Sequence, residues 1–203
     1  MTGQVPGSVT VVGNYDLLNF NTVLVNQSIP ATGVACHTAP ACSVFTLASS
    51  LLSVLLNPNG LLTGLDDPSR LTGPAVITAD YQYSPVSYFD PYLFYYGCVV
   101  ADANGAASVG VDCTITATGF NTGGQKVYSQ DFEYKSSGKL VQDMTAGYFN
   151  QGWSGLKVKR LELTVSNNAT TAALFDNFLA TVHGPQNAAT TIDFKKTGSS
   201  ILG

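Results

Sequence analysis

The sequence predicts an all-β fold, an antiparallel β-sandwich with one short amphipathic helix near residues 43–56. Three strand-like runs within residues 87–134 carry this prediction. They are joined by Asn104-Gly105 and by the Asn-Thr-Gly-Gly run at 121–124, which tolerate the positive φ of hairpin turns. Only 11% of the residues are charged, which suits short strands better than a helical bundle. At 203 residues the chain is predicted to be a single domain, residues 1–203, with a loosely ordered tail from about residue 184.

The first third of the chain combines short strands with the predicted helix. Residues 8–12 and 22–25 are predicted strands, and residues 31–43 form a loop that contains Cys36 and Cys42. Ser43 is a candidate N-cap, and the Asn-Pro-Asn-Gly run at 57–60 is a candidate stop. Apolar residues recur between them at helical spacing: Val44, Leu47, Ala48, Leu51, Leu52, Leu55 and Leu56. We expect this helix to cover an edge or end of the sandwich rather than to bind a partner.

Strand patterns dominate the remaining sequence. Residues 75–81 and 172–182 read as strands, and the Thr-Thr-Ile-Asp-Phe run at 190–194 is a predicted edge strand. Within residues 127–134, one face has the alternating set Tyr128, Gln130, Phe132 and Tyr134. We expect this set to face the core and the intervening carboxylates to face water.

Four cysteines indicate two local disulfides, Cys36–Cys42 and Cys98–Cys113, as the simplest of three pairings. If Ala103 pairs with Ser108 in a hairpin, Cys98 lies opposite Cys113, whereas a two-residue turn leaves the two cysteines diagonal. A zinc site at Cys36 and His37 is the alternative, but its spacing lacks the paired short intervals of structural zinc sites. Disulfides favour a secreted protein.

Two glycosylation sequons, at Asn26 and Asn168, agree with secretion. The N-terminus has neither a basic start nor an apolar run, so we interpret Met1 as replacing a removed leader. The net charge is −4 and basic residues cluster only at 157–160, which argues against nucleic acid and anionic lipid as partners. No run is long and apolar enough to predict a membrane span.

Several local motifs carry a family resemblance. An aromatic-rich strand ends in Gly97-Cys98, an Asn-Gly-Ala-Ala-Ser turn starts at Asn104, and a Cys-Thr-Ile-Thr-Ala-Thr-Gly strand starts at Cys113. Trp-Ser-Gly-Leu at 153–156 and Phe-Asp-Asn-Phe at 175–178 extend the match over residues 75–182. This pattern resembles small secreted fungal β-sandwich proteins. The resemblance implies a jelly roll of the galactose-binding or carbohydrate-binding-module kind, and an extracellular or cell-wall location.

The same resemblance suggests a structural calcium ion where the first and last strands meet. Asp16, Asp176 and Asn177 are the expected oxygen ligands. The alternative is that Asp176 accepts hydrogen bonds from backbone amides and ties the sheet ends together.

The sequence offers no catalytic constellation, and we predict that the protein is not an enzyme. A Gly-x-Ser-x-Gly motif is absent, and the two histidines, His37 and His183, have no sequence-level link to a serine. Asp131 and Glu133 share one strand face, but that face is the one predicted to be solvated.

Carbohydrate binding is the predicted function. Tyrosine and tryptophan rings stack on sugar rings, while amides bind the hydroxyls. The residues 148–153 combine rings, amides and a glycine in one loop, with Tyr81, Tyr83 and Tyr92 as further exposed candidates. The predicted ligand-binding residues are Tyr92, Tyr148, Asn150, Gln151 and Trp153. Trp153 is equally compatible with a buried loop anchor.

A different class of function is also open. Low charge and unpaired sheet edges favour a self-associating structural surface protein, with residues 191–202 adding to a neighbour's sheet as a homo-oligomer. A monomer that neither assembles nor binds glycan would indicate a secreted effector.

Overall fold

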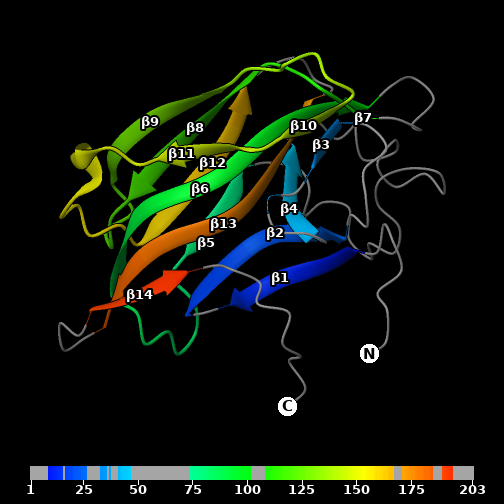
Figure 1. The fold of residues 1–203 in the computed structure, drawn as a ribbon. Helices are drawn as coiled ribbons and strands as arrows, with labels where there is room; N and C mark the ends of the chain where they lie inside the picture. The colour runs from blue at the N-terminus through cyan, green and yellow to red at the C-terminus, as the bar shows by residue number, and fades with distance from the viewer. Residues whose placement is uncertain are drawn as a thin grey trace.

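A computed structural model of the chain describes residues 9–15, 17–26, 33–35, 37, 41–46, 74–101, 108–166, 171–184 and 189–193. These residues are almost entirely in strands and their connections (Figure 1). One short 3₁₀ helix, η2, spans Gln151–Trp153. The strands are β1 (Val9–Tyr15), β2 (Leu18–Asn26), β3 (Gly33–Ala35), β4 (Ala41–Thr46), β5 (Ala75–Thr78), β6 (Tyr88–Ala101), β7 (Ser108–Gly110), β8 (Cys113–Phe120), β9 (Lys126–Tyr134), β10 (Val141–Asp143), β11 (Thr145–Tyr148), β12 (Arg160–Ser166), β13 (Thr171–His183) and β14 (Ala189–Asp193).

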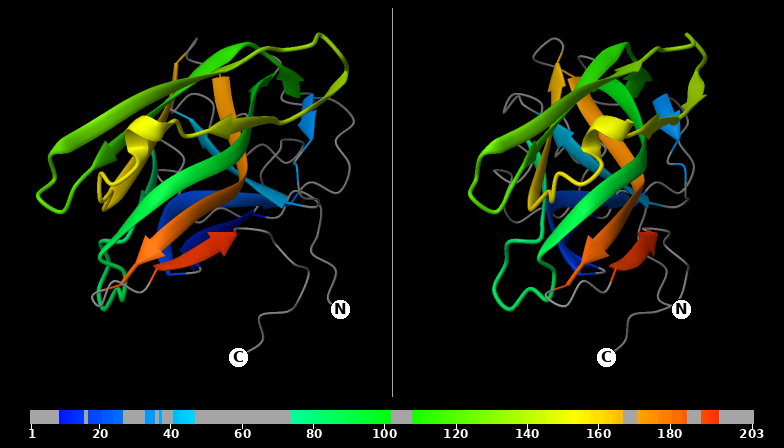
Figure 2. Two further views of the ribbon diagram at one scale, coloured as in Figure 1. Left: turned by 60° about the vertical axis from the view of Figure 1, so that its left-hand side comes forward. Right: turned by 90° about the vertical axis from the view of Figure 1, so that its left-hand side faces the viewer.

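The main strands form two layers. One layer has the order β4-β13-β6-β11 and the other has the order β5-β12-β8-β9, while β2 pairs with both β4 and β5 and so joins the layers along one side. Figure 2 shows the two layers from further directions. From β4 to β13, the main strands alternate between the layers except for β8 and β9, which are neighbours in one layer, and all pairings within the layers are antiparallel. The predicted antiparallel sandwich is therefore confirmed. On the other side, the end strands β9 and β11 are not neighbours in the sheet that the described residues form.

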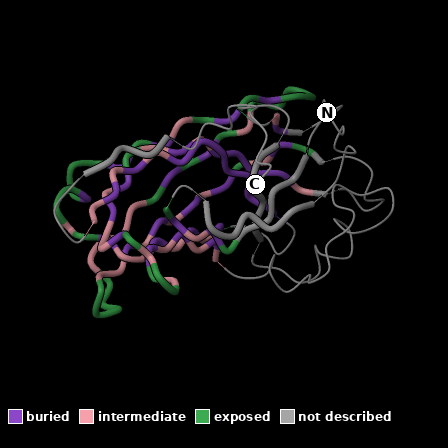
Figure 3. The backbone as a smooth tube through the Cα atoms, turned by 90° about the horizontal axis from the view of Figure 1, so that it is seen from below, coloured by how far each residue is buried: buried purple, intermediate pink, exposed green. Residues whose placement is uncertain are grey.

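Aromatic side chains fill the space between the layers. Phe94 of β6 packs edge-on against Phe132 of β9, with ring centroids 4.9 Å apart. The alternation predicted for β9 is confirmed at its second half, where Phe132 and Tyr134 are buried and the carboxylates Asp131 and Glu133 are exposed. Figure 3 shows this burial following the strands, with exposed residues gathered in the connections. The sheet faces therefore pack as the two-residue period requires.

The long strand β13 contains a bulge that changes which side chains face the core. Its pairing with β6 shifts between Asp176 and Leu179, and Asn177 has a φ of 49°, a conformation that asparagine tolerates better than most residues. A second shift follows, because Leu179 pairs with Leu93 whereas Ala180 pairs with Pro91. This leaves Tyr92 as an extra residue on β6, next to a proline that has no N–H to donate to the ladder.

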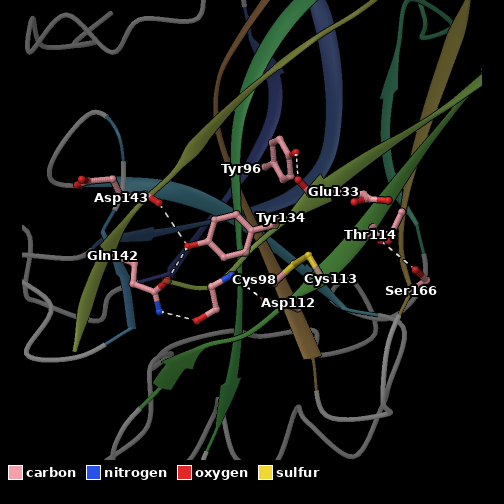
Figure 4. The surroundings of a disulfide bond; sticks show 11 residues. Tyr96, Cys98, Asp112, Cys113, Thr114, Glu133, Tyr134, Gln142, Asp143 and Ser166 are labelled. Atoms are coloured by element: carbon pink, nitrogen blue, oxygen red, sulfur yellow. Dashed lines mark hydrogen bonds between the residues drawn. A yellow bond between two sulfur atoms is a disulfide. The ribbon is translucent and has the colours of Figure 1, made fainter. Parts of the chain in front are cut away.

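The Cys98–Cys113 disulfide is present, and it connects the two layers. Cys98 lies in β6 and Cys113 begins β8 in the opposite layer (Figure 4). The observed register is the one of the two-residue-turn alternative and not the pairing of Ala103 with Ser108, because Ala101 pairs with Ser108 and Val111 donates its N–H to the Cys98 carbonyl. The chain crosses between layers immediately afterwards, so Cys113 meets Cys98 across the sandwich rather than across a hairpin.

The predicted helix near residues 43–56 is wrong at its start. Ala41–Thr46 is strand β4, which pairs with β2 on one side and β13 on the other. Ser43 is therefore a strand residue and not an N-cap. Backbone pairing on both sides outweighs the helical spacing that begins at Val44. The remainder of the predicted helix lies outside the described residues.

The C-terminal part contains the predicted edge strand. Strand β14 pairs with β13 of the same chain, with Thr181 opposite Thr191. Its described bounds, Ala189–Asp193, are one residue earlier at each end than the 190–194 run. In the described part of the chain, no helix meets the length and hydropathy needed to cross a membrane.

Candidate functional site

A surface groove with a volume of about 460 Å³ lies where the segment after β11 passes the first half of β6 and the last half of β13. We call it the Tyr92 groove. Its wall mixes apolar side chains with amides, hydroxyls and one carboxylate. The lining residues are Asp90, Pro91, Tyr92, Phe149, Asn150, Gln151, Trp153, Ser154, Leu179, Ala180 and Thr181. Small-molecule sites in proteins commonly combine apolar side chains with a few polar groups in this way.

Two exposed tyrosines stand together beside this groove. Tyr92 is 55% exposed and Tyr148 is 58% exposed, and their ring centroids are 6.2 Å apart with an angle of 84° between the planes. The register shift on β6 projects Tyr92 outward, while Tyr148 ends β11 opposite Leu93. The backbone fixes the pair, since Phe149 donates its N–H to the Tyr92 carbonyl at 2.9 Å.

The side chain of Gln130 on β9 makes several hydrogen bonds to Tyr148 and the segment that follows it. Gln130 Nε2 donates to the Tyr148 carbonyl at 2.9 Å. Gln130 Oε1 accepts from the Asn150 backbone N–H at 3.0 Å and from the Trp153 indole Nε1 at 2.8 Å. Asn150 also caps η2, because its Oδ1 accepts from the Gly152 N–H at 2.9 Å. The segment is thereby ordered before any ligand arrives.

Trp153 is buried, with 1% of its surface exposed. Its ring packs edge-on against Phe149 and Tyr128, with centroids 5.0 and 5.3 Å away. Gly119 of β8 makes room for it, since a Cβ there would lie 2.7 Å from Trp153 Cζ3. The prediction that Trp153 offers a stacking face is therefore wrong, and the alternative of a buried anchor describes its packing. The reason is that its N–H and its ring both find partners inside.

The other predicted ligand-binding residues, Tyr92, Tyr148, Asn150 and Gln151, come together at one place, and all are exposed. Sequence reasoning missed Asp90 and Thr181, which lie opposite each other on β6 and β13 and both line the groove. The Asp90-Pro91-Tyr92 run was the available signal, since proline marks an irregular point in a strand.

Asp90 is held by His183. Asp90 Oδ2 and His183 Nε2 are 2.8 Å apart. The His183 ring in turn stacks on Tyr88, the residue opposite it in the ladder, with centroids 4.3 Å apart and 12° between the planes. Directly opposite and diagonal neighbours on a sheet are within this reach.

The structure describes two of the three expected calcium ligands. Asp176 and Asn177 are buried at the bulge of β13, and Asp176 Oδ1 accepts the Asn177 N–H at 2.8 Å. Asp16 lies outside the described residues. Within the described ranges, no group of three or more His, Cys, Asp or Glu side chains is placed to hold a metal ion. Calcium stays a prediction, and calorimetric titration of the chelated protein tests it.

Several other sequence predictions fall outside what the structure describes. The structure does not describe Cys36 or Asn168, and it does not describe the side chains of Cys42 and Asn26. The Cys36–Cys42 disulfide and the two glycosylation sequons therefore stay predictions. His37, the residue beside the alternative zinc site, is described. Its ring stacks on Tyr95 of β6, with centroids 3.5 Å apart.

Comparison with known proteins gives little. No protein-family model matches the sequence, and no curated protein matches it. Among solved structures, the chain is similar to a DUF4465 family protein from Bacteroides caccae, with 12% sequence identity and a TM-score of 0.46. The match covers 86% of this chain and 88% of that one.

Proposed function

We propose that the protein is a secreted, non-enzymatic module that binds carbohydrate in the Tyr92 groove, at a cell wall or another extracellular surface. The single observation that carries the proposal is the exposed pair of Tyr92 and Tyr148 beside a groove lined by amides and a carboxylate. Rings at right angles suit a carbohydrate chain, because one ring stacks on a sugar face while the other supports its edge.

The polar lining supplies the second half of carbohydrate recognition. Gln151 and Asn150 present amide groups that can donate to and accept from sugar hydroxyls, and Asp90 adds a carboxylate to the lining. Gln130 fixes the segment that carries the amides, so little ordering entropy is lost on binding. This combination of a prepared apolar face and few polar groups supports a binding role.

The extracellular part of the proposal has separate support. The Cys98–Cys113 disulfide joins the two layers, and such bonds persist in oxidising compartments. Extracellular polysaccharide is the ligand class that a protein in such a compartment meets at a cell wall.

The test is a glycan array and a polysaccharide retention assay with the oxidised full-length chain. Tyr92→Ala and Tyr148→Ala should each weaken retention about tenfold, because each removes a stacking ring at the surface. Intact sugar chains should be recovered from the complex, as expected for binding without hydrolysis.

Tyr83→Asn is the matched control. Tyr83 is 91% exposed in the connection between β5 and β6 and does not line the groove, and its φ of 64° is one that asparagine tolerates. Its replacement should leave retention unchanged. Equal losses in all three variants would reject the groove as the site, and release of shortened sugars would reject the non-enzymatic role.

A further inference from the structure

The charge of the Tyr92 groove comes from one residue. Among the described residues that line it, only Asp90 carries a formal charge, and the other polar groups are neutral amides and hydroxyls. Asp90 is therefore the source of negative charge in the lining that the structure describes, and this charge is uncompensated when His183, 2.8 Å from Oδ2, is neutral.

The Asp90 carboxylate is fixed in position. His183 holds Oδ2, while Oδ1 is buried and has no hydrogen-bond partner in the described ranges. His183 is itself fixed by stacking on Tyr88. Because the side chain is only partly exposed, its charge is less screened by salt than a fully solvated one.

A cation lies nearby but outside the groove. Lys157 Nζ is 5.9 Å from the centroid of the Tyr88 ring, and Lys157 does not line the groove. The described lining thus contains this carboxylate and no ammonium group.

We propose that Asp90 is a specificity-determining residue that makes the Tyr92 groove select neutral glycans over acidic ones. This inference rests on the proposed carbohydrate-binding function. A uronate or carboxymethyl group brings a like charge close to this fixed carboxylate and is repelled, whereas the hydroxyls of a neutral sugar are not. A hydroxyl-rich, unsubstituted chain is the ligand class that this lining fits.

The experiment compares polymers with and without charge on the same backbone. The probes are hydroxyethylcellulose and carboxymethylcellulose, dextran and carboxymethyl-dextran, and galactan and polygalacturonate, each immobilised at matched density. Full-length protein should be retained by a neutral polymer about tenfold more strongly than by its charged partner. Asp90→Asn, which keeps the size and one acceptor oxygen, should bring the two retentions to within about twofold.

A second measurement does not depend on the variant. For the unmodified protein, the preference for the neutral polymer should shrink in about 1 M salt, where the screening length is about 3 Å. Equal retention of both polymers at low salt, a preference for the charged one, or full discrimination in Asp90→Asn would each overturn the inference. If Tyr92→Ala lowers retention but charge has no effect, only the inference fails. If no polymer is retained, the carbohydrate-binding function fails with it.

Discussion

At the scale of single residues, Gln130 connects the segment of η2 to the rest of the sandwich. Its side-chain amide makes three hydrogen bonds: it donates to the Tyr148 carbonyl and accepts from the Asn150 backbone N–H and the Trp153 indole N–H. The indole N–H is buried, so removing its acceptor leaves an unsatisfied donor in an apolar surrounding. Leaving a buried donor without an acceptor costs more free energy than the hydrogen bond itself contributes to stability.

Gln130→Leu should therefore lower the free energy of unfolding by about 2–3 kcal/mol and should also weaken glycan retention. Equilibrium unfolding in urea measures the first effect. Gln82→Leu, the same change at an exposed position in the connection between β5 and β6, should stay within about 0.5 kcal/mol of the parent protein. Equal stability of the two variants would contradict the bracing role of Gln130.

Tyr96 provides a pH prediction. Burial and, to a smaller degree, the Glu133 carboxylate raise the pKa of Tyr96 to about 12, and its hydroxyl donates to the Glu133 carbonyl at 2.8 Å. An unfolded tyrosine loses its proton near pH 10, so above that pH the unfolded state binds fewer protons than the folded state. The free energy of unfolding should therefore fall as pH rises from about 10 towards 12.

Unfolding curves across this range measure the slope, and Tyr96→Phe should reduce it. Tyr134 contributes in the same direction, because burial, helped by Asp143 and Asp112, raises its pKa. A slope that is unchanged in Tyr96→Phe would mean that other groups cause the alkaline loss of stability.

The residues of the site were only partly predictable. Tyr92, Tyr148, Asn150 and Gln151 follow from residue type and local turn chemistry, which short-range sequence carries. Asp90 and His183 are separated by 93 positions, so no local pattern joins them. Burial of Trp153 depends on the missing side chain at Gly119 of β8, which only the packed structure reveals.

At the scale of elements, the disulfide is a connection between layers. Cys98 and Cys113 are 15 residues apart in the chain, with Cα atoms 6.1 Å apart. Figure 4 shows Tyr134 near this disulfide, and the Tyr134 hydroxyl donates to the Asp143 carbonyl at 3.3 Å. A buried polar cluster and a covalent bond thus meet at this end of the sandwich.

The Cys98→Ala/Cys113→Ala double variant should lose about 3 kcal/mol of unfolding free energy, as the loop-closure estimate for a loop of this length gives. Thermal and urea unfolding measure the loss. The single Tyr134→Phe variant should lose about 1 kcal/mol, which separates the hydroxyl from the covalent bond. A double variant as stable as the parent would show that the layers need no covalent connection.

Strand β4 shows why elements were harder to predict than the fold class. Its Val44 begins a run with helical spacing, yet it pairs with Val23 on β2 and Leu174 on β13. A strand between two partners satisfies its backbone groups through residues far away in sequence. The spacing of apolar residues within one segment does not show which strands it will pair with. The alternation in the second half of β9 was predictable, because it reflects a single buried face.

At the scale of the whole molecule, strand order explains why the sandwich was predictable and its connections were not. The alternating patterns and turn residues specify strands, whereas the order of the strands depends on which of them pair. The crossing between layers at Val111 and Asp112 changes the partner of Cys113, and the hairpin prediction had no means to detect it.

The pairing of β14 within its own chain leads to a prediction about assembly. Because Ala189–Asp193 already pairs with β13, this strand is not required to add to a neighbour's sheet. We expect a monomer of about 21.3 kDa in size-exclusion chromatography with light scattering, at every concentration tested. Oligomers that grow with concentration would favour the self-associating structural protein instead.

Among the described strands, the end strands β9 and β11 are not paired with each other, and we expect ligand binding on this side of the sandwich to stabilise the fold. Strand β2 joins the layers on one side, whereas on the other side Gln130 of β9 reaches the end of β11 through its side chain. A glycan in the groove would touch β6, β13 and the segment that crosses to β12. This segment could then move away from the two strands only if the glycan were released. By mass action, a ligand at 100 times its dissociation constant adds about 2.7 kcal/mol to the folded state. Opening of the segment that Gln130 holds by hydrogen bonds would then cost more free energy in the bound protein than in the free protein.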